Sequence, residues 1–409
     1  MGRRSRGRPA GEHPLGLHPR HARARPRARS GAGSPPRPAD LGSGGGRRAH
    51  LDPPGGQGRP RGRGVCGGGR HGHHQPHRDH PPLCRGVAVT FVLGIDGGQT
   101  STRAAVADLQ GRVLARAQAG PWDDLSTEEK RQRCRGVLEE LLRQIGAQLP
   151  LGAIRHAALG LTGAQRGPSA VESWMRERLP GVVSLAIHHD TQSNFRGADP
   201  YGNPGVLVIA GGGSIAWGLD GAGREAFAGG YGYLLGDAGS GYELGRQAVR
   251  AVLEASQRLA PDTRLTQALL AHLGLGQPWD LRLAFYDGRL ERQRVAGLLP
   301  VVARVAGEGD RMAQHILREG GAALAGLAGA VMRQLEFWDP PVYPTGGVFR
   351  VDVLREAFIQ ALARLAPKAE VRLPRLEPLG GALVLALEQA GPIHPGQIAS
   401  LEGALGYDT

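Results

Sequence analysis

One pattern occurs twice in this sequence and constrains the fold more than any other: three short apolar segments joined by glycine-containing turns. The first copy, VTFVLGIDGGQTSTRAAVADLQGRVLARAQA, starts at residue 89, and the second, GVLVIAGGGSIAWGLDGAGREAFAGG, starts at residue 205. Apolar runs of this length bounded by turn residues are typical of β-strands. We therefore expect two halves, each built on a unit of three strands.

Further helices and strands follow the first unit. Ser126, with Glu129 three positions later, predicts a capping box at the start of a helix over residues 126–148. The segments RHAALGLTG and VVSLAIHHD are typical of buried strands, and a helix near residues 168–178 separates them. The first half is thus expected to alternate strands and helices after its three-strand unit.

The second half repeats this order with a longer helical insertion over residues 240–338. The segment PPVYPTGGV predicts a late strand, followed by a helix from about residue 350 and a closing helix after Pro378. Two such halves predict an α/β protein with two lobes around a cleft. We place the lobes at residues 89–204 and 205–409.

Residues 1–88 differ in composition from the rest. They contain 18 arginines, no lysine and four acidic residues, so the net charge of +13 belongs to them and the remainder is nearly neutral. Stretches such as RARPRARSGAGSPPRP have too few apolar residues to offset the entropy cost of ordering. We interpret the segment as a GC-rich region translated from an incorrect start site, with the true start near Val87 or Val89. A disordered extension and a nucleic-acid-binding segment are the alternatives.

Cysteine usage and hydropathy indicate the compartment. The three cysteines, Cys66, Cys84 and Cys134, form neither a disulfide framework nor a CxxC pair, which fits a reducing compartment. No apolar run approaches the roughly 20 residues that span a bilayer. We therefore expect a cytoplasmic protein with no membrane partner and, for the folded region, no nucleic-acid partner.

The first glycine turn, GIDGGQTSTR, follows a buried strand. Gly97 and Gly98 allow backbone N–H groups to face phosphate oxygens, and Gln99 and Thr100 add donors. Asp96 can hold Mg²⁺ directly or through water. An ordinary hairpin is the alternative for this motif taken alone.

The second glycine turn, IAGGGSIAWG, stands at the matching place in the second half. Gly211, Gly212, Gly213 and Ser214 form a turn that can approach phosphate. A single glycine-rich hairpin is a weak signal. Two such turns facing one cleft can hold one triphosphate.

Carboxylates and a third glycine turn complete the candidate site. Asp190, at a strand end in AIHHDTQSN, is placed to accept a substrate hydroxyl proton, although it could instead cap the following helix. Asp237 and Glu243 are the carboxylates of the glycine-rich segment GGYGYLLGDAGSGYELG. The turn PTGGVF is placed to lie against an adenine ring through Gly346 and Gly347. The GxxxxGK[ST] motif of P-loop proteins does not occur.

Together these segments resemble the BadF/BadG/BcrA/BcrD-type ATPases, a family that includes N-acetylglucosamine kinase. The match runs from about residue 91 to residue 386, and its most specific element is the block GGxGxxxGDxGSxYxxG. The resemblance implies a duplicated actin-like/sugar-kinase (ribonuclease H-like) ATPase fold. It also implies a Mg-ATP-dependent kinase for an amino sugar, with N-acetylglucosamine as the expected substrate.

The resemblance implies a role for each site residue. The first two glycine turns would hold the ATP phosphates, the TGG turn would approach the nucleoside, and Asp190 would be the base. The sugar would contact a second set of residues: Thr162, Gly163, Asp190, Gly212, Gly213 and Asp237. An asparagine often found in the family after the third strand is replaced here by Trp122, Asp123 or Asp124, and Ile215 follows Ser214 where the family can have a polar residue.

Three alternatives stay open. A glucosamine or N-acetylmuramic acid kinase differs only in the sugar. An ATP-driven activator of a 2-hydroxyacyl-CoA dehydratase would need about four cysteine thiolates for its cluster, and only Cys134 lies outside residues 1–88. A nucleotide-switched binding protein would bind ATP without turnover. The sequence also leaves open whether the protein forms a homodimer.

Overall fold

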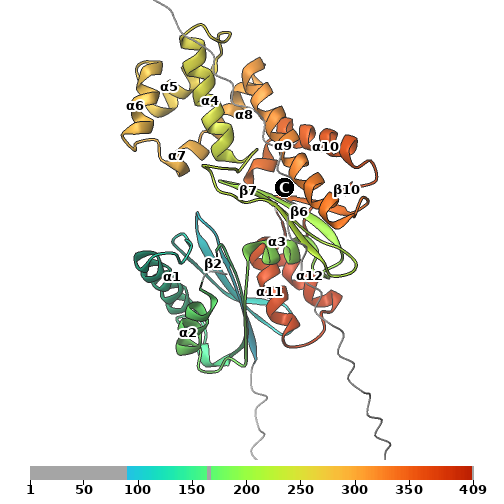
Figure 1. Ribbon diagram of the computed structural model, residues 1–409. Helices are drawn as coiled ribbons and strands as arrows, with labels where there is room; N and C mark the ends of the chain where they lie inside the picture. The colour runs from blue at the N-terminus through green and yellow to red at the C-terminus, as the bar shows by residue number, and fades with distance from the viewer. Residues whose placement is uncertain (1–89, 164–166, 408–409) are drawn as a thin grey trace, which may run out of the picture. The chain divides into compact units, whose positions relative to one another are not determined.

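The structure is a computed structural model that describes residues 90–163 and 167–407. The predictions for residues 1–88 lie outside the described residues. The described part contains two five-stranded sheets with helices packed on their faces (Figure 1). None of the helices in these two ranges combines the length and the apolar composition needed to cross a bilayer.

The first sheet has the strand order β3-β2-β1-β4-β5. The strands β1, β2 and β3 are antiparallel neighbours, whereas β4 and β5 continue the sheet in parallel. Its strands are β1 (Phe91–Gly97), β2 (Thr102–Asp108), β3 (Val113–Ala119), β4 (Ile154–Leu161) and β5 (Ser184–His188). The helices of this half are α1 (Glu128–Gly146), α2 (Pro168–Arg178) and α3 (Asp190–Ala198), with a 3-10 turn, η1 (Leu151–Ala153), before β4.

The second sheet repeats that order as β8-β7-β6-β9-β10, again with three antiparallel strands followed by parallel ones. The predicted duplication is therefore confirmed. Its strands are β6 (Gly205–Ala210), β7 (Ser214–Leu219), β8 (Glu225–Gly229), β9 (Pro341–Thr345) and β10 (Glu370–Val371). The helices that follow α3 in the chain are α4 (Gly241–Ser256), α5 (Leu265–Leu273), α6 (Pro278–Tyr286), α7 (Arg292–Ala296), α8 (Leu299–Gly307), α9 (Arg311–Leu335), the short η3 (Gly347–Arg350), α10 (Asp352–Leu365), α11 (Pro378–Glu388) and α12 (Pro395–Leu405).

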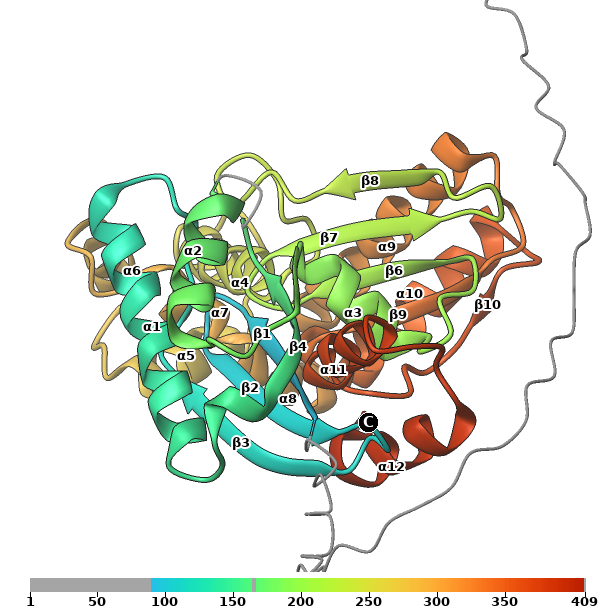
Figure 2. The ribbon, with the colours of Figure 1, turned by 90° about the horizontal axis from the view of Figure 1, so that it is seen from below.

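Alternating side chains give each sheet two buried faces. In β1, Leu93 and Ile95 join the core under α1 and α2, whereas Val92 joins the core under α11 and α12 (Figure 2). The second sheet likewise packs α4 and α9 on one face. Its other face receives α3, whose Phe195 stacks edge-on against Trp217 at 4.7 Å between ring centroids. Such an aromatic pair contributes about 0.5–1.5 kcal/mol beyond its buried area.

Glycines let α3 pack closely on its neighbours. A Cβ on Gly381 of α11 would overlap the Ser193 carbonyl of α3, and one on Gly160 of β4 would overlap the Ser193 hydroxyl. On α3 itself, a Cβ on Gly197 would lie 2.9 Å from the Glu377 carbonyl oxygen. The position of α3 is therefore fixed by backbone contact with α11 and the residues before it, and by contact of the Ser193 side chain with β4.

Four local features differ from the sequence predictions. The N-cap of α1 is Thr127, whose side chain accepts a hydrogen bond from the Lys130 N–H, and not Ser126. The strand β5 is half-buried along its whole length, where a buried strand was expected. The elements β10 and α12 were not predicted. The last two helices, α11 and α12, pack on the first sheet although they follow the second in the chain.

Candidate active site

The first glycine turn lies where β1 ends beside β4. The backbone carbonyl of Gly97 accepts a hydrogen bond from the Thr162 N–H at 3.0 Å, and the Gly98 N–H donates to the Ser101 carbonyl at 3.1 Å. A Cβ on Gly97 would stand 2.5 Å from Leu161 Cδ2, whereas one on Gly98 would meet only a carbonyl oxygen at 3.9 Å. Gly97 is thus required by packing, and Gly98 leaves open space above the turn.

Asp96 belongs to a charged cluster at this turn. Its Oδ2 lies 3.3 Å from Arg103 Nη2, and Arg103 also forms an ion pair with Glu377, the residue before α11. Burial raises the pKa of Asp96 to about 6 against the opposing effect of Arg103, and the carboxylates of Asp190 and Glu377 raise it further. Two carboxylates share one guanidinium here, so the cluster attracts a cation.

Asp190 begins α3 but does not cap it. The N-cap is His189, whose Nδ1 accepts a hydrogen bond from the Thr191 N–H at 3.2 Å. Asp190 Oδ2 instead accepts a hydrogen bond from the Thr162 hydroxyl at 2.7 Å. The helix-cap alternative for Asp190 is therefore wrong, because a histidine ring nitrogen fills that role.

The second oxygen of Asp190 faces His189. The distance from Asp190 Oδ1 to His189 Nδ1 is 2.8 Å, which makes an ion pair only when the ring is protonated. The same Nδ1 cannot accept from the Thr191 N–H and carry a proton toward Asp190 at once. The side chain of Asp190 is 24% exposed, so its carboxylate is reachable from solvent.

The segment that replaces the family asparagine is held by its own partners. Trp122 is fully buried and donates its Nε1 proton to the Thr162 carbonyl at 3.1 Å. Lys130 Nζ lies 2.7 Å from Asp124 and 3.3 Å from Asp123, and its hydrogen bond holds the pKa of Asp124 far below the usual range. Asp124 also borders Gly163, whose φ of +69° is in the left-handed region.

The second glycine turn lies between β6 and β7 and is open at two of its glycines. Nothing lies within 4 Å of a Cβ placed on Gly211 or Gly212. A Cβ on Gly213 would stand 2.8 Å from Asp237 Oδ2, so Gly213 is required by that contact. The Ser214 hydroxyl donates to the Ala238 carbonyl at 2.8 Å, and its single proton is therefore not directed at a ligand.

Asp237 lies directly under this turn. It is 4% exposed and has a φ of +59°, an unusual backbone conformation for a residue other than glycine. It accepts hydrogen bonds from the Ser214 N–H and from Arg292 Nη2, both at 3.3 Å. Burial raises the pKa of Asp237 against these two interactions. Glu243, in contrast, pairs with Arg246 on α4.

The TGG turn is joined to the second glycine turn through the end of β6. Gly346 has a φ of +98°, and a Cβ there would overlap the Ala210 carbonyl, so only glycine fits. The Gly346 N–H donates to the Tyr407 hydroxyl at 3.0 Å. Gly347 has open space around it. The structure thus brings the TGG turn and Gly211 to the same edge of the second sheet.

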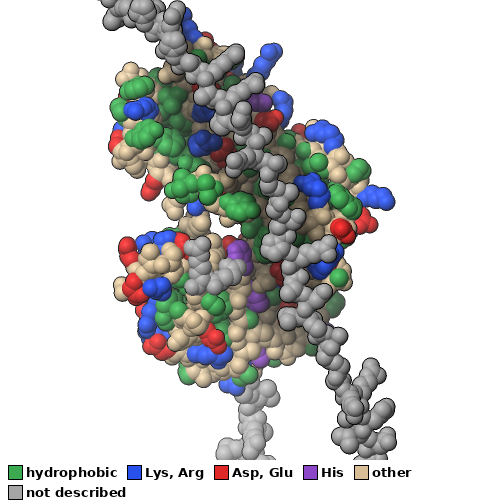
Figure 3. Space-filling view, in the orientation of Figure 1, with side chains coloured by type: hydrophobic (Ala, Val, Ile, Leu, Met, Phe, Trp, Pro, Cys, Tyr) green, Lys and Arg blue, Asp and Glu red, His purple; other side chains and the backbone are tan. Residues whose placement is uncertain are grey.

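Sequence reasoning missed several residues of these clusters. Arg292, Glu377 and Tyr407 lie outside the predicted motifs and reach the site only through the fold. Arg103 and His189 stand within the segments GIDGGQTSTR and AIHHDTQSN, but the sequence assigned them no role. The space-filling view shows the surface hollowed between the two lobes on one face (Figure 3). The ends of β1 and β6 carry the first and second glycine turns.

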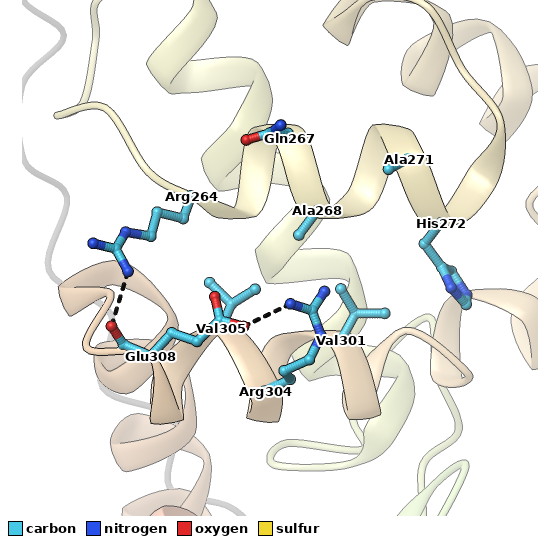
Figure 4. Close-up of a pocket in the computed structure, with 9 residues that line it drawn as sticks. All are labelled: Arg264, Gln267, Ala268, Ala271, His272, Val301, Arg304, Val305 and Glu308. Atoms are coloured by element: carbon cyan, nitrogen blue, oxygen red, sulfur yellow. Dashed lines mark hydrogen bonds and ion pairs between the residues drawn. The ribbon is translucent and has the colours of Figure 1, made fainter.

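A separate cavity of about 560 Å³ lies between α5 and α8 (Figure 4). Its charged side chains are paired, since Arg264 Nη1 donates to the Glu308 carbonyl at 3.0 Å and Arg304 Nη1 to the Glu308 carboxylate at 2.7 Å. None of its lining residues belongs to a glycine turn. We therefore assign the candidate active site to the glycine turns and not to this cavity.

Two repeated lobes with glycine turns at equivalent strand ends define an ATPase of the actin-like/sugar-kinase fold. The chain belongs to the BadF/BadG/BcrA/BcrD ATPase family, whose model matches residues 93–386, and the predicted resemblance is confirmed. It is 32% identical to N-acetyl-D-glucosamine kinase of Dictyostelium discoideum, over 72% of this chain and 97% of the relative. It is 30% identical to N-acetylmuramic acid/N-acetylglucosamine kinase of Clostridium acetobutylicum, over 72% and 98%.

Solved structures agree with the fold assignment. A protein from Chromobacterium violaceum, provisionally named N-acetylglucosamine kinase, superposes with a TM-score of 0.59 at 30% identity, covering 73% of this chain and 99% of that one. A similarly named protein from Porphyromonas gingivalis gives 0.58 at 20% identity, covering 74% and 99%. The predicted fold class is confirmed.

Proposed function

We propose that this chain is an ATP-dependent kinase that transfers the γ-phosphoryl group of ATP to a hydroxyl of an amino sugar, with N-acetylglucosamine as the first substrate to test. The observation that carries the proposal is the pairing of two equivalent glycine turns with a reachable carboxylate, Asp190, that does not cap its helix. The named relatives support the same class of reaction, since they phosphorylate amino sugars according to their names.

In the proposed reaction, the sugar oxygen attacks the γ-phosphorus while the bond from that phosphorus to the bridging oxygen of ADP breaks. Asp190 accepts the proton of the attacking hydroxyl, and Thr162 orients its carboxylate through the 2.7 Å hydrogen bond. The glycine turns hold the phosphates through backbone N–H groups, so positioning and charge stabilisation supply most of the rate. In this proposal Asp237 and Gly213, which are in contact with each other, hold the sugar.

Residues of the first turn fit a magnesium ion. Among the described residues, no group of three histidine, cysteine or acidic side chains is arranged to hold a metal by itself. Mg²⁺ commonly needs only one or two carboxylates, with phosphate oxygens and water as the other ligands. Asp96 would be that carboxylate, because it is partly buried and shares its arginine partner with a second carboxylate, Glu377. When bound, the ion neutralises charge on the transferring phosphoryl group.

The alternatives differ in testable ways. A dehydratase activator would need a cluster held by several thiolates, whereas the single cysteine in the described ranges, Cys134, is buried in the core under α1. Glucosamine and N-acetylmuramic acid are the competing sugars, since relatives named for them also match. A cytoplasmic location, where ATP is available, is part of this proposal.

One assay tests the proposal. N-acetylglucosamine, glucosamine, N-acetylmuramic acid and glucose are each supplied with Mg-ATP, and ADP release is measured in a coupled assay. We expect release that depends on an amino sugar and is abolished by chelation of the metal. ATP hydrolysis that ignores every sugar, or binding without turnover, would contradict the kinase assignment.

A further inference from the structure

The short helix α7 reaches both glycine turns. Arg292 Nη2 lies 3.3 Å from Asp237 Oδ2 and 3.1 Å from the position that a Cβ on Gly213 would take. The next residue, Gln293, donates its Nε2 proton to the backbone carbonyl of Gln99 at 3.3 Å. One helix of the second lobe thus contacts the second turn directly and the first turn through the neighbouring side chain.

The guanidinium of Arg292 keeps most of its hydrogen-bonding capacity. It has five N–H donors in a planar fork, and its side chain is 26% exposed. Its plane is held over the Tyr233 ring, with 5.1 Å between the guanidinium carbon and the ring centroid. Within the described ranges, Asp237 is the one carboxylate at ion-pair distance from it.

The space next to this guanidinium is open. Nothing lies within 4 Å of a Cβ placed on Gly211 or Gly212, while Gly213 is in contact with the Arg292–Asp237 pair. A phosphate over the open glycines would be adjacent to the remaining N–H donors of Arg292. Arginine binds phosphate oxygens through two parallel hydrogen bonds, which a lysine cannot reproduce.

We propose that Arg292 binds the phosphate chain of the nucleotide at the second glycine turn. The inference rests on the proposed function, because it assumes that the turn holds phosphate. In this proposal, Arg292 supplies the positive charge that the P-loop lysine supplies in other nucleotide-binding proteins. This sequence has no P-loop motif and therefore no such lysine. Asp237 then orients the guanidinium from one side, and the nucleotide phosphates occupy the other.

A purely structural role for Arg292 predicts a different result. In that case the guanidinium only orients Asp237, and its loss weakens sugar binding while nucleotide binding is unchanged. The two roles predict different effects on the binding of ligands that contain phosphate. ADP and inorganic tripolyphosphate report on the phosphate contact, and adenosine reports on the nucleoside site alone.

The experiment measures the binding of ADP, tripolyphosphate and adenosine to the full chain by calorimetry. The variants are Arg292→Gln and Arg292→Lys, with Arg294→Gln as the matched control. Arg294 is on the same helix with the same charge, but it donates to the Arg289 carbonyl and is directed elsewhere. We expect Arg292→Gln to weaken ADP and tripolyphosphate about tenfold or more, the usual effect of losing a hydrogen bond to a charged group. Adenosine binding should not change.

Two results would overturn the inference. One is wild-type affinity for ADP in Arg292→Gln, whatever happens to the KM for sugar, and the other is an equal loss in Arg294→Gln. If Arg292→Gln does not fold, the Arg292→Lys variant provides the test. Weaker ADP binding with unchanged adenosine binding in that variant supports the inference. Unchanged binding of both ligands contradicts it. Failure of the wild-type chain to bind ADP would contradict the proposed function itself.

Discussion

Each half has an aspartate–arginine pair beside its glycine turn, but the net charge around the pair differs between the halves. In the first half, Asp96 lies 3.3 Å from Arg103, and a second carboxylate, Glu377, pairs with the same guanidinium. In the second half, Asp237 lies 3.3 Å from Arg292 without a second carboxylate among the described residues. The first cluster has negative charge left for a cation, and the second has donors left for an anion.

This difference shows how a duplicated fold can support two chemical roles. Equivalent strands of the two sheets end at equivalent glycine turns. The side chains that approach each turn come from unrelated elements, with Glu377 preceding α11 and Arg292 starting α7. The backbone repeat therefore sets where the two turns lie, and unrelated elements set which charged side chains surround each turn.

The largest expected effect is a loss of kcat on substitution of Asp190, which substitution of Asp237 should not cause. In Asp190→Asn, kcat should fall by about 10²-fold or more, because the amide cannot accept the proton. Stability should change little, since the amide oxygen can still accept from Thr162. Asp237→Asn should mainly raise the KM for sugar. Steady-state kinetics of the two variants test this difference in role. An equal loss of kcat in both variants would contradict it. Normal turnover in Asp190→Asn would contradict the mechanism.

The next effect compares adjacent glycines of the first turn. Gly97→Ala should lower the unfolding free energy by about 1–3 kcal/mol, the usual cost of overpacking, because its Cβ would stand 2.5 Å from Leu161. Gly98→Ala should have almost no effect on stability, since the space above it is open. Urea unfolding of the two variants checks this. Equal losses would show that the turn is constrained by its backbone and not by packing.

A third test addresses the cation site. Asp96→Asn should raise the Mg²⁺ concentration for half-maximal activity by about tenfold or more, as expected when a metal site is weakened. The charge-removing variant Asp237→Asn is the control, and its Mg²⁺ requirement should stay close to wild type. An unchanged Mg²⁺ requirement in Asp96→Asn would remove the asymmetry proposed for the two halves.

The smallest effect is a pH dependence of stability. Because burial raises the pKa of Asp237, the folded state binds this proton more tightly than the unfolded chain does. The contribution of this group to stability is therefore favourable at low pH, relative to neutral pH, and falls as the pH rises from the ordinary value of 3.8 through the raised pKa. Asp237→Asn removes this term, and asparagine tolerates the positive φ. The variant should gain stability relative to wild type as the pH rises toward 7. The unfolding free energies of wild type and Asp237→Asn are measured as a function of pH. A constant difference between them at all pH values would contradict the effect of burial on Asp237.

The fold was predictable because its signals are local. Strand lengths, turn residues and helical periodicity give the duplicated order, and the helix expected near residues 168–178 is observed as α2 over that range. The closing helices were harder to place, since nothing in their composition shows that they pack on the first sheet. Which sheet a helix covers depends on tertiary packing and not on the pattern within the helix.

The site was predictable where residues are consecutive and missed where the fold joins distant ones. Arg292 meets Asp237 from 55 positions away in the chain, within a segment that has no motif. Ser214 is at the expected turn, but its hydroxyl is bonded to Ala238, which a sequence does not reveal. The sequence predicts Asp190 as a cap of α3 only as an alternative to its role as a base, and the structure has His189 as the cap; histidine is an uncommon cap, whereas aspartate is a common one.

The close packing of α3 has a consequence for how variants of this protein would fail. The helix carries Asp190 at one end and is in backbone contact with Gly381 of α11. A methyl group on Gly381 would push the helix outward and carry the carboxylate away from Thr162. A genetic screen would score such a variant as inactive. The loss of activity would come from displacement of the helix, although Gly381 itself has no reactive side chain.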